Sequence, residues 1–248
     1  MLPPTRAQAD SRLRAFTPAG KEAGGAGHHT LGTWWWLAES GALRLTEGRN
    51  RFTQEDGHGL LVVTITCASG QPVLVGLSQG APEFGAVCDD YDGLADALTL
   101  TTRDLATAGL PAQVVSTGVP HLLVPLRDRA AVDRARPDVH RLATILQRLG
   151  GEGCYLFSRD TINPDSIAYA RFFNPTLGIA EDAATGTAAG PLASQLVAHR
   201  FASADGTLHI EQGHAMGRPS LIQVHVSTEA VTISGRCVVS CRGRLRVA

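Results

Sequence analysis

The sequence predicts an α+β protein with two pseudo-symmetric lobes, in each of which a curved mixed sheet wraps around one central apolar helix. Three observations lead to this fold class: a motif that recurs at a constant spacing, a helical segment in each copy that is apolar on all faces, and β-branched runs beside each helix. The chain has 248 residues, of which 44% are hydrophobic, so it can form two lobes that each bury a core.

The repeated motif carries most of this prediction. Residues 14–20 read Arg-Ala-Phe-Thr-Pro-Ala-Gly, and residues 171–178 read Arg-Phe-Phe-Asn-Pro-Thr-Leu-Gly. Their Arg, Phe and Pro lie 157 positions apart, and the same offset places Thr30 on Thr187. Further along both copies, a Gly-His turn precedes a β-branched run. The same order of features at nearly one offset indicates a structural unit that is built twice.

In the first copy, we expect a helix over residues 30–39 and a strand over residues 60–66. The helix contains the run Trp34-Trp35-Trp36 between two leucines, so apolar side chains occur on nearly every face. A helix without a polar face is enclosed by its own domain. We therefore expect the tryptophans to pack in a core rather than to form an aromatic binding surface.

The second copy predicts a longer series of elements. An amphipathic helix is expected over residues 137–149, because its apolar residues share one face and Gly150-Gly151 follows it. A second helix, apolar nearly all round, is expected over residues 187–200. The expected strands cover residues 114–126, 154–157, 221–226 and 231–239.

These elements predict a first lobe over residues 1–113 and a second lobe over residues 114–235, with a C-terminal strand over residues 236–248 as a candidate to complete the first. In the second copy, 57 residues of strands and helix lead up to Arg171, whereas only 13 residues precede Arg14. We therefore expect the first lobe to lack its opening strands and a helix, and the chain to be an N-terminally shortened form of a longer protein.

Bulk composition excludes several classes of function. With 22 basic and 23 acidic residues, the chain has no charge excess that would favour nucleic acid or an anionic membrane. It has no uninterrupted run of about 20 apolar residues and no apolar N-terminal run of signal-peptide length. The five cysteines are scattered, so a disulfide framework is not expected, and Cys237 and Cys241 are predicted to be buried in or beside strands rather than to bind metal. A soluble cytoplasmic protein without a metal is the expectation.

Both apolar helices begin after a turn of small residues. The first turn covers Gly24–Thr30 and the second Glu181–Gly190. The first amides of a helix have no partner within it, and the helix dipole adds positive potential, so such turns can bind anions. Taken singly, each turn is better explained as an ordinary capped helix start. Because the turn is repeated, we expect the two to clamp one small carboxylate ligand where the two copies face each other.

The best titratable candidates lie in these turns. His28 is suited to hydrogen bonding or proton relay, and Asp182 is suited either to that role or to capping its helix. Glu181 is expected to be solvated, and His29 to be a partner of His28 rather than a metal ligand, because no third ligand has suitable spacing. The remaining histidines are expected to be structural: His58, His121, His140, His199, His209, His214 and His225.

Five segments together resemble the PhzF family of phenazine-biosynthesis proteins. They are Phe16–Gly20, Gly25–Gly32, Ser116–Pro120, Glu181–Gly190 and Gly217–Ser220, and they span nearly the whole chain. The family usually has proline where this chain has His29 and Ala183. The resemblance implies a fold like that of diaminopimelate epimerase, with two pseudo-symmetric lobes and a site in the cleft.

The same resemblance implies a cofactor-free isomerase and, typically, a homodimer. In phenazine producers, trans-2,3-dihydro-3-hydroxyanthranilate is tautomerised by proton transfer between ring carbons. His28 and Asp182 match family residues that contact and orient the substrate, as catalytic candidates. The substrate-binding candidates match the turns that hold it: Gly27, Gly186, Thr187 and Ala188. The family's principal acid/base is a glutamate in a Ser-Glu-Thr-like segment, which we expect just upstream of Met1.

Two other functions compete with this hypothesis. An amino-acid racemase or epimerase with paired thiols would need a cysteine in each helix-opening turn, and this chain has none in either. A non-catalytic protein that binds a small ligand would keep the cleft without the acid/base. The alternatives therefore differ in chemistry rather than in fold.

Overall fold

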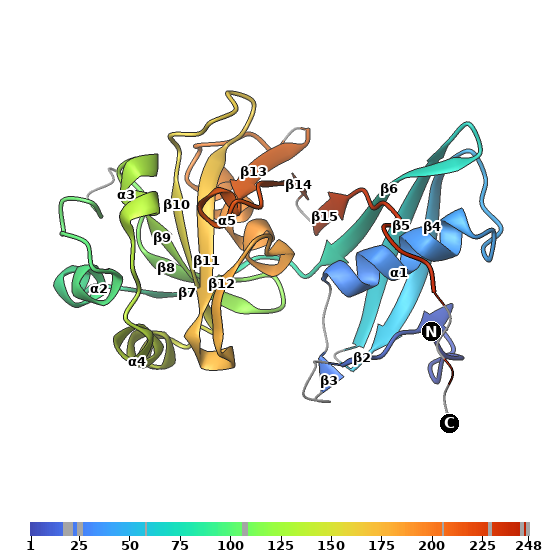
Figure 1. Cartoon of the computed structure of the whole chain (residues 1–248), viewed down its shortest axis with the longest axis horizontal. Coiled ribbons are helices and arrows are strands. Elements are labelled where there is room, and N and C mark those ends of the chain that lie inside the picture. The colour runs from blue at the N-terminus through green and yellow to red at the C-terminus, as the bar shows by residue number, and fades with distance from the viewer. Residues whose placement is uncertain are drawn as a thin grey trace. The chain divides into compact units, whose positions relative to one another are not determined.

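The structure is a computed structural model, and it describes residues 1–16, 22–23, 27–57, 59–105, 109–204, 206–227, 230–243 and 246. Three parts of the sequence predictions lie outside the described residues: the motif positions 17–20, the glycine-rich positions 24–26 and His58. Figure 1 shows the whole chain with its helices and strands labelled.

The chain divides into two compact units. Unit 1 comprises Met1–Leu77 with Ser234–Ala248, and unit 2 comprises Ser78–Ile233. Residues 78–113, which the sequence assigned to the first lobe, therefore make their contacts within unit 2. The reason is that β7 (Glu83–Val87) pairs with β8 (Gln113–Ser116), and α2 (Tyr91–Leu98) packs against α4 (Val139–Leu149). The pairing partners of β7 and α2 come later in the chain, so a strand-by-strand scan could not place them.

In unit 1, one helix packs on a small sheet. α1 (His28–Glu39) contacts β5, and Figure 1 shows it lying across the strands. The sheet order is β1-β4-β5-β6, with β1 parallel to β4 and the other pairs antiparallel. Its strands are β1 (Ser11–Arg12), β4 (Gly48–Asp56), β5 (Gly59–Ala68) and β6 (Gln71–Gln79), and β2 (Ala15–Phe16) and β3 (Glu22–Ala23) form a separate hairpin.

The tryptophan run of α1 is buried only in part. Trp34 and Trp35 are 1% and 9% exposed and pack on apolar residues of β5 and β6, as expected for core residues. Trp36 is 53% exposed, which corrects the expectation for that residue. Three consecutive residues of a helix span about 200° around its axis, so a helix that packs on one side cannot bury all three.

Unit 2 is a mixed sheet with helices on both faces. The strand order is β15-β14-β13-β11-β10-β9-β8-β7, with β12 paired to β11; β9–β10 and β11–β13 are parallel. The remaining strands are β9 (Pro120–Pro125), β10 (Gly153–Ser158), β11 (Ala168–Asn174), β12 (Ile179–Asp182), β13 (Leu208–Gln212), β14 (Ser220–Val226) and β15 (Val231–Gly235). Its other helical elements are α3 (Arg129–Arg134), α5 (Gly186–Ala198) and the 3₁₀ turns Pro175–Leu177 and His214–Met216. This mixed sheet, with its helices, confirms the α+β class.

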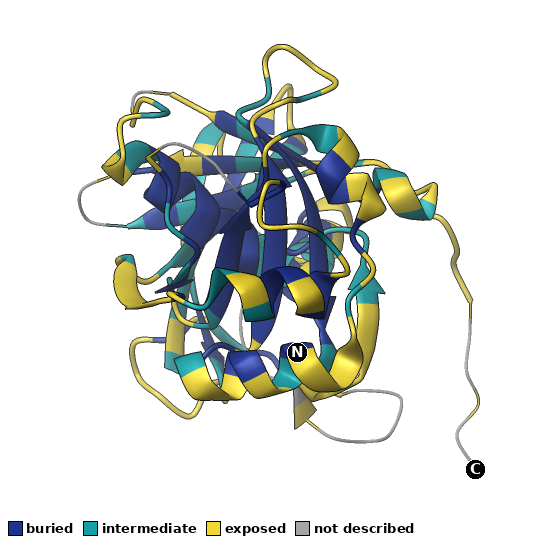
Figure 2. Ribbon diagram, turned by 90° about the vertical axis from the view of Figure 1, so that its left-hand side faces the viewer, coloured by how far each residue is buried: buried dark blue, intermediate teal, exposed yellow. Residues whose placement is uncertain are grey.

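Alternation along the strands separates two cores. Leu122 and Leu156 pack with α2, α3 and α4, whereas their neighbours Leu123 and Phe157 pack with α5. Successive side chains of a strand point to opposite faces, so both faces of this sheet are covered. Figure 1 shows α2 and α4 on one side of the sheet and α5 on the other, and Figure 2 shows the buried strands as a dark core behind helices with exposed outer faces. The sequence predicted one central helix in this lobe; that helix, α5, covers one face of the sheet, and α2, α3 and α4 cover the other.

The expected helices are confirmed to within two residues at each end. α4 begins after Asp138, whose carboxylate accepts hydrogen bonds from the amides of His140 and Arg141, and it ends at Gly150 with φ +75°. α5 begins one residue earlier and ends two residues earlier than expected, and nine of its residues are buried. The cap residues and the apolar periodicity were sufficient signals for these two helices.

The strand expected over residues 231–239 is confirmed only at its start, and the strand expected after residue 235 is not found among the described residues. β15 ends at Gly235, and the described residues after it, 236–243 and 246, form no strand. Val238 is 88% exposed and Cys241 is exposed, while Cys237 is half-buried against the unit 1 core. A β-branched run predicts a strand only where a partner strand is present. Residues 234–248 belong to unit 1.

The repeat is visible as the same ion pair in both units. Arg14 donates to both carboxylate oxygens of Glu22 at 2.9 Å, and Arg171 donates to both oxygens of Glu181 at 2.8 Å. Each guanidinium lies 4.9 Å from the ring centre of the phenylalanine two residues on. Both pairs join the strands of an antiparallel hairpin, β2–β3 in one unit and β11–β12 in the other. Glu181 is therefore paired, which corrects its expected solvation.

Candidate functional site

The start of α5 brings together four of the predicted site residues: Asp182, Gly186, Thr187 and Ala188. Asp182 ends β12, Thr185 is the N-cap residue, and Gly186 and Thr187 open the helix. The amides of the next two residues both donate to the Thr185 carbonyl, at 3.2 and 3.0 Å. The amides of Gly186 and Thr187, by contrast, have no acceptor within the described part of the chain. Two free donors at the positive end of a helix are suited to an anion.

The Asp182 carboxylate is fixed from one side. Its Oδ2 accepts a 2.6 Å hydrogen bond from the Thr185 hydroxyl, so Asp182 lies across the turn that it precedes. Its side chain is half-buried, which leaves part of the carboxylate accessible. Asp182 is not the N-cap residue, because Thr185 occupies that position and α5 has no side-chain cap. The alternative expectation, that Asp182 caps the helix that follows it, is therefore wrong.

Gln212 holds this turn in place from the end of β13. Its Nε2 donates to the Asp182 carbonyl at 2.7 Å and to the Thr185 hydroxyl at 3.0 Å. Its Oε1 accepts from the Tyr155 hydroxyl at 2.8 Å and from the Thr185 amide at 3.1 Å. Burial, with the charge of Asp182 as the second cause, raises the pKa of Tyr155, which keeps this hydroxyl a donor. Every donor and acceptor of the buried Gln212 amide is used, and such a network rigidifies its members.

His121 is a member of the site that the sequence had grouped with the structural histidines. It lies at the second position of β9, it is 2% exposed, and its Nε2 lies 3.1 Å from the Thr187 hydroxyl oxygen. Burial lowers the pKa of His121 to about 4, so the ring is neutral at physiological pH. Its only sequence signal is that it follows the Ser116–Pro120 motif directly. Gln212 had no signal beyond the Gly-His turn that it precedes.

The start of α1 repeats part of this arrangement within unit 1. Gly27 is the N-cap residue and supplies no side-chain cap, and His28 is exposed in the first turn. Buried Gln54 donates to the Thr30 hydroxyl at 3.4 Å and accepts from the Trp34 indole at 2.8 Å. A buried glutamine from the following strand thus contacts a threonine at the helix start in both units. That the two turns face each other stays a prediction.

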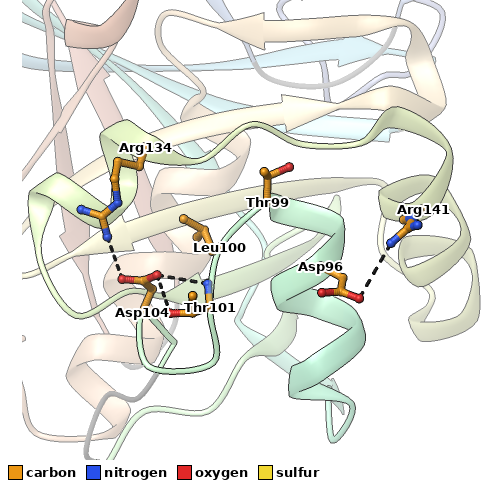
Figure 3. A pocket seen from close by; sticks show the side chains of 7 residues that line it. All are labelled: Asp96, Thr99, Leu100, Thr101, Asp104, Arg134 and Arg141. Atoms are coloured by element: carbon orange, nitrogen blue, oxygen red, sulfur yellow. Dashed lines mark hydrogen bonds and ion pairs between the residues drawn. The ribbon is translucent and has the colours of Figure 1, made fainter.

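A surface depression of unit 2 is not a convincing site. It measures about 550 Å³ and lies in unit 2 among α2, the loop that follows it, α3 and α4 (Figure 3). Its charges are paired with one another: Arg134 donates to Asp104 at 2.7 Å, and Arg141 lies 3.8 Å from Asp96. Asp104 also accepts from the amide and hydroxyl of Thr101. These groups satisfy each other and stabilise the loop after α2.

Two further features concern metals and membranes. Among the described residues, no group of three or more His, Cys, Asp or Glu side chains could hold a metal ion. None of the helices in the described part of the chain combines the length and the apolar character needed to cross a bilayer.

Comparison with known proteins gives a consistent family. A family model described as phenazine biosynthesis-like protein (PhzC-PhzF) matches residues 1–243. An uncharacterized isomerase, YddE, from Escherichia coli K12 is 33% identical over 241 residues, which cover 93% of this chain and 78% of YddE. The trans-2,3-dihydro-3-hydroxyanthranilate isomerase of Pseudomonas aeruginosa is 29% identical over 244 residues, covering 95% of this chain and 79% of that protein.

A solved structure supports the same relationship. The structure of a protein described as a predicted epimerase from Pseudomonas aeruginosa matches 100% of this chain and 83% of its own, with a TM-score of 0.81 and 31% identity. The family match extends over both units and includes the turn of Asp182 and Thr187. The chain therefore belongs to the phenazine biosynthesis-like (PhzC-PhzF) protein family.

Proposed function

We propose that this protein is a cofactor-independent isomerase that transfers a proton within a small carboxylate substrate, such as trans-2,3-dihydro-3-hydroxyanthranilate. The observation that carries the proposal is the start of α5, where a fixed carboxylate and unpaired amides lie in one turn of a chain that belongs to this family. A relative that is 29% identical is named as the isomerase of that compound.

In this proposal the residues divide the work between binding and proton handling. The amides of Gly186 and Thr187 hold the substrate carboxylate at the helix start. Ala188, the third substrate-binding candidate, follows them with its own amide bonded to the Thr185 carbonyl. Asp182 orients the substrate, with its carboxylate held by Thr185. Gly27 and His28 are the corresponding candidates of the first turn. The homodimer and the cytoplasmic location stay predictions.

The test is an isomerase assay in D₂O with trans-2,3-dihydro-3-hydroxyanthranilate. The reaction is followed by loss of the starting compound and by deuterium at a ring carbon of the product. Asp182→Asn keeps the size of the side chain and removes its charge, so we expect turnover to fall by roughly 10²-fold or more. Asp165→Asn is the matched control, because Asp165 is exposed in the same unit, and its turnover should match that of the unchanged protein.

The same assay separates the competing function. Saturable binding of the compound without turnover or deuterium incorporation would favour a non-catalytic ligand-binding protein. Full activity of Asp182→Asn would remove Asp182 from the catalytic candidates, while leaving the isomerase itself in place.

A further inference from the structure

His121 has one ring nitrogen with a partner and one without. Nε2 contacts the Thr187 hydroxyl at 3.1 Å, whereas Nδ1 is buried with no hydrogen-bond partner within the described part of the chain. The Phe172 ring packs edge-on against the imidazole, 5.1 Å between centres. Gly153 pairs with His121 on the neighbouring strand, and a Cβ there would lie 3.1 Å from Nδ1 and would overlap the Phe172 ring. The side of the imidazole that carries Nδ1 therefore faces apolar groups.

This environment selects one tautomer of the neutral ring. A neutral imidazole carries one hydrogen, on either Nδ1 or Nε2. A hydrogen on Nδ1 would be a buried donor without an acceptor, and orphaned N–H groups are rarer in proteins than acceptors that lack a donor. With the hydrogen on Nε2, the ring donates to the Thr187 oxygen, and only an acceptor nitrogen is left unpaired.

The tautomer in turn fixes what the Thr187 hydroxyl can do. A hydroxyl has one hydrogen to donate, and its oxygen can accept. If His121 supplies the hydrogen between the two side chains, the hydrogen of Thr187 remains for another acceptor. The Thr187 side chain is half-buried, and its hydroxyl has no other partner among the described residues. Together with the amides of Gly186 and Thr187, this hydroxyl gives the start of α5 three donors, which lie in the same turn as the Asp182 carboxylate.

We propose that His121 is a positioning residue, which as the Nε2–H tautomer commits the Thr187 hydroxyl to donating to a substrate carboxylate and so sets the preference of the site for carboxylates. The proposal rests on the isomerase function proposed above for its substrate, but the preference itself can be measured without turnover. A carboxylate, which accepts with both oxygens, matches these three donors better than a carboxamide, which has one oxygen and presents two N–H donors of its own.

The first experiment reads the tautomer directly. Long-range ¹H–¹⁵N correlation spectra of the ¹⁵N-labelled full chain, with His121 assigned by its absence in His121→Gln, should show a protonated Nε2 and a bare Nδ1. The pattern should be unchanged between pH 8 and pH 6. A proton on Nδ1, or a doubly protonated ring in that range, overturns the proposal.

The second experiment measures the preference. Anthranilate and its carboxamide, anthranilamide, are titrated calorimetrically against the unchanged chain, His121→Leu, His121→Gln and Thr187→Val. We expect the unchanged chain to bind anthranilate more tightly, and His121→Leu and Thr187→Val each to lose roughly tenfold of that preference. Gln can donate from near the Nε2 position, so His121→Gln should restore part of it.

A double variant tests whether the two residues act as one. His121→Leu combined with Thr187→Val should lose no more preference than Thr187→Val alone, because His121 is proposed to act through Thr187. Additive losses, or an unchanged preference in folded His121→Leu, overturn the proposal. An intact preference without isomerase turnover would instead contradict the proposed function and leave the role of His121 standing.

Discussion

At the scale of single residues, the candidate site depends on side chains that hold the reactive groups rather than on those groups alone. Gln212 makes four hydrogen bonds to three residues, and His121 contacts Thr187 from another strand. A buried polar group is stabilising when all its bonds are made and costly when they are not. The consequences can be measured separately for each residue.

Replacement of Gln212 should cost far more than replacement of an equally buried glutamine. Gln212→Leu leaves the Tyr155 hydroxyl, the Thr185 amide and the Asp182 carbonyl without partners, so we expect a loss of about 3 kcal/mol in the free energy of unfolding. Gln195→Leu is the control: Gln195 is also fully buried, but among the described residues its side chain makes one bond, to the Pro111 carbonyl, and its Oε1 has no partner. Urea unfolding measures both, and equal losses would contradict the role given to the network.

His121 should make unfolding depend on pH. Its pKa in the folded protein is about 4, below the value of about 6.5 for an exposed histidine, so the unfolded chain binds a proton first as the pH falls. Its contribution is therefore fully present above about pH 6.5 and is lost between there and pH 4, by roughly 3 kcal/mol in all. Urea unfolding of the unchanged chain and of His121→Gln from pH 8 to pH 4 should show the unchanged chain losing more. If the unfolding free energies of the two chains changed with pH in parallel, the His121 ring would not be held neutral in the folded protein.

At the scale of elements, the turn between β13 and β14 positions the helix start. Gly213 has φ +86°, and a Cβ there would lie 2.6 Å from the Ala183 carbonyl oxygen and would overlap the Arg218 carbonyl oxygen. Both neighbours are backbone atoms, which cannot rotate away as a side chain could. This close approach keeps Gln212 within reach of Asp182.

Two glycines of this turn provide a matched pair of variants. Gly217→Ala meets only the cost of its left-handed backbone, about 1 kcal/mol, because φ is +66° and open space surrounds it. Gly213→Ala adds the clash with two carbonyls, so we expect a loss of about 3 kcal/mol or more. Gly213→Ala should also lower turnover, by moving Gln212 away from Asp182. Thermal unfolding and the isomerase assay report the two effects, and similar results for both variants would argue against the close packing.

The sequence was informative where a signal is local. The caps and periodicity of α4 and the apolar α5 predicted both helices closely, and the repeated turn predicted Asp182 and Thr187 as site residues. It was uninformative where the partner is distant. His121 and Thr187 are 66 positions apart, Gln212 and Thr185 are 27 apart, and neither contact has a counterpart in local pattern. The strand prediction after Gly235 was wrong for the same reason, because a β-branched run forms a strand only where a partner strand is present.

At the scale of the whole molecule, the duplicated ion pair has become unequal between the units. Arg14 and Glu22 are about 40% exposed, whereas Arg171 is 6% exposed. Arg171 also donates to the carbonyls of Val132 and Ala135, at 3.0 and 3.1 Å, so it ties β11 to the end of α3. The same two residue types thus have a surface role in unit 1 and an internal role in unit 2.

This inequality predicts different costs for the same substitution. Arg171→Gln leaves the half-buried Glu181 carboxylate and two carbonyls without their partner, so we expect unit 2 to lose roughly 3–5 kcal/mol of unfolding free energy. Arg14→Gln removes an exposed pair that solvent screens, so we expect little measurable change. Urea unfolding followed by circular dichroism compares the two, and high salt should leave the difference largely intact because Arg171 is shielded from solvent. If both variants lost the same unfolding free energy, the ion pair would have the same role in both units. The packing of α3 against β11 would then have to depend on apolar contacts alone.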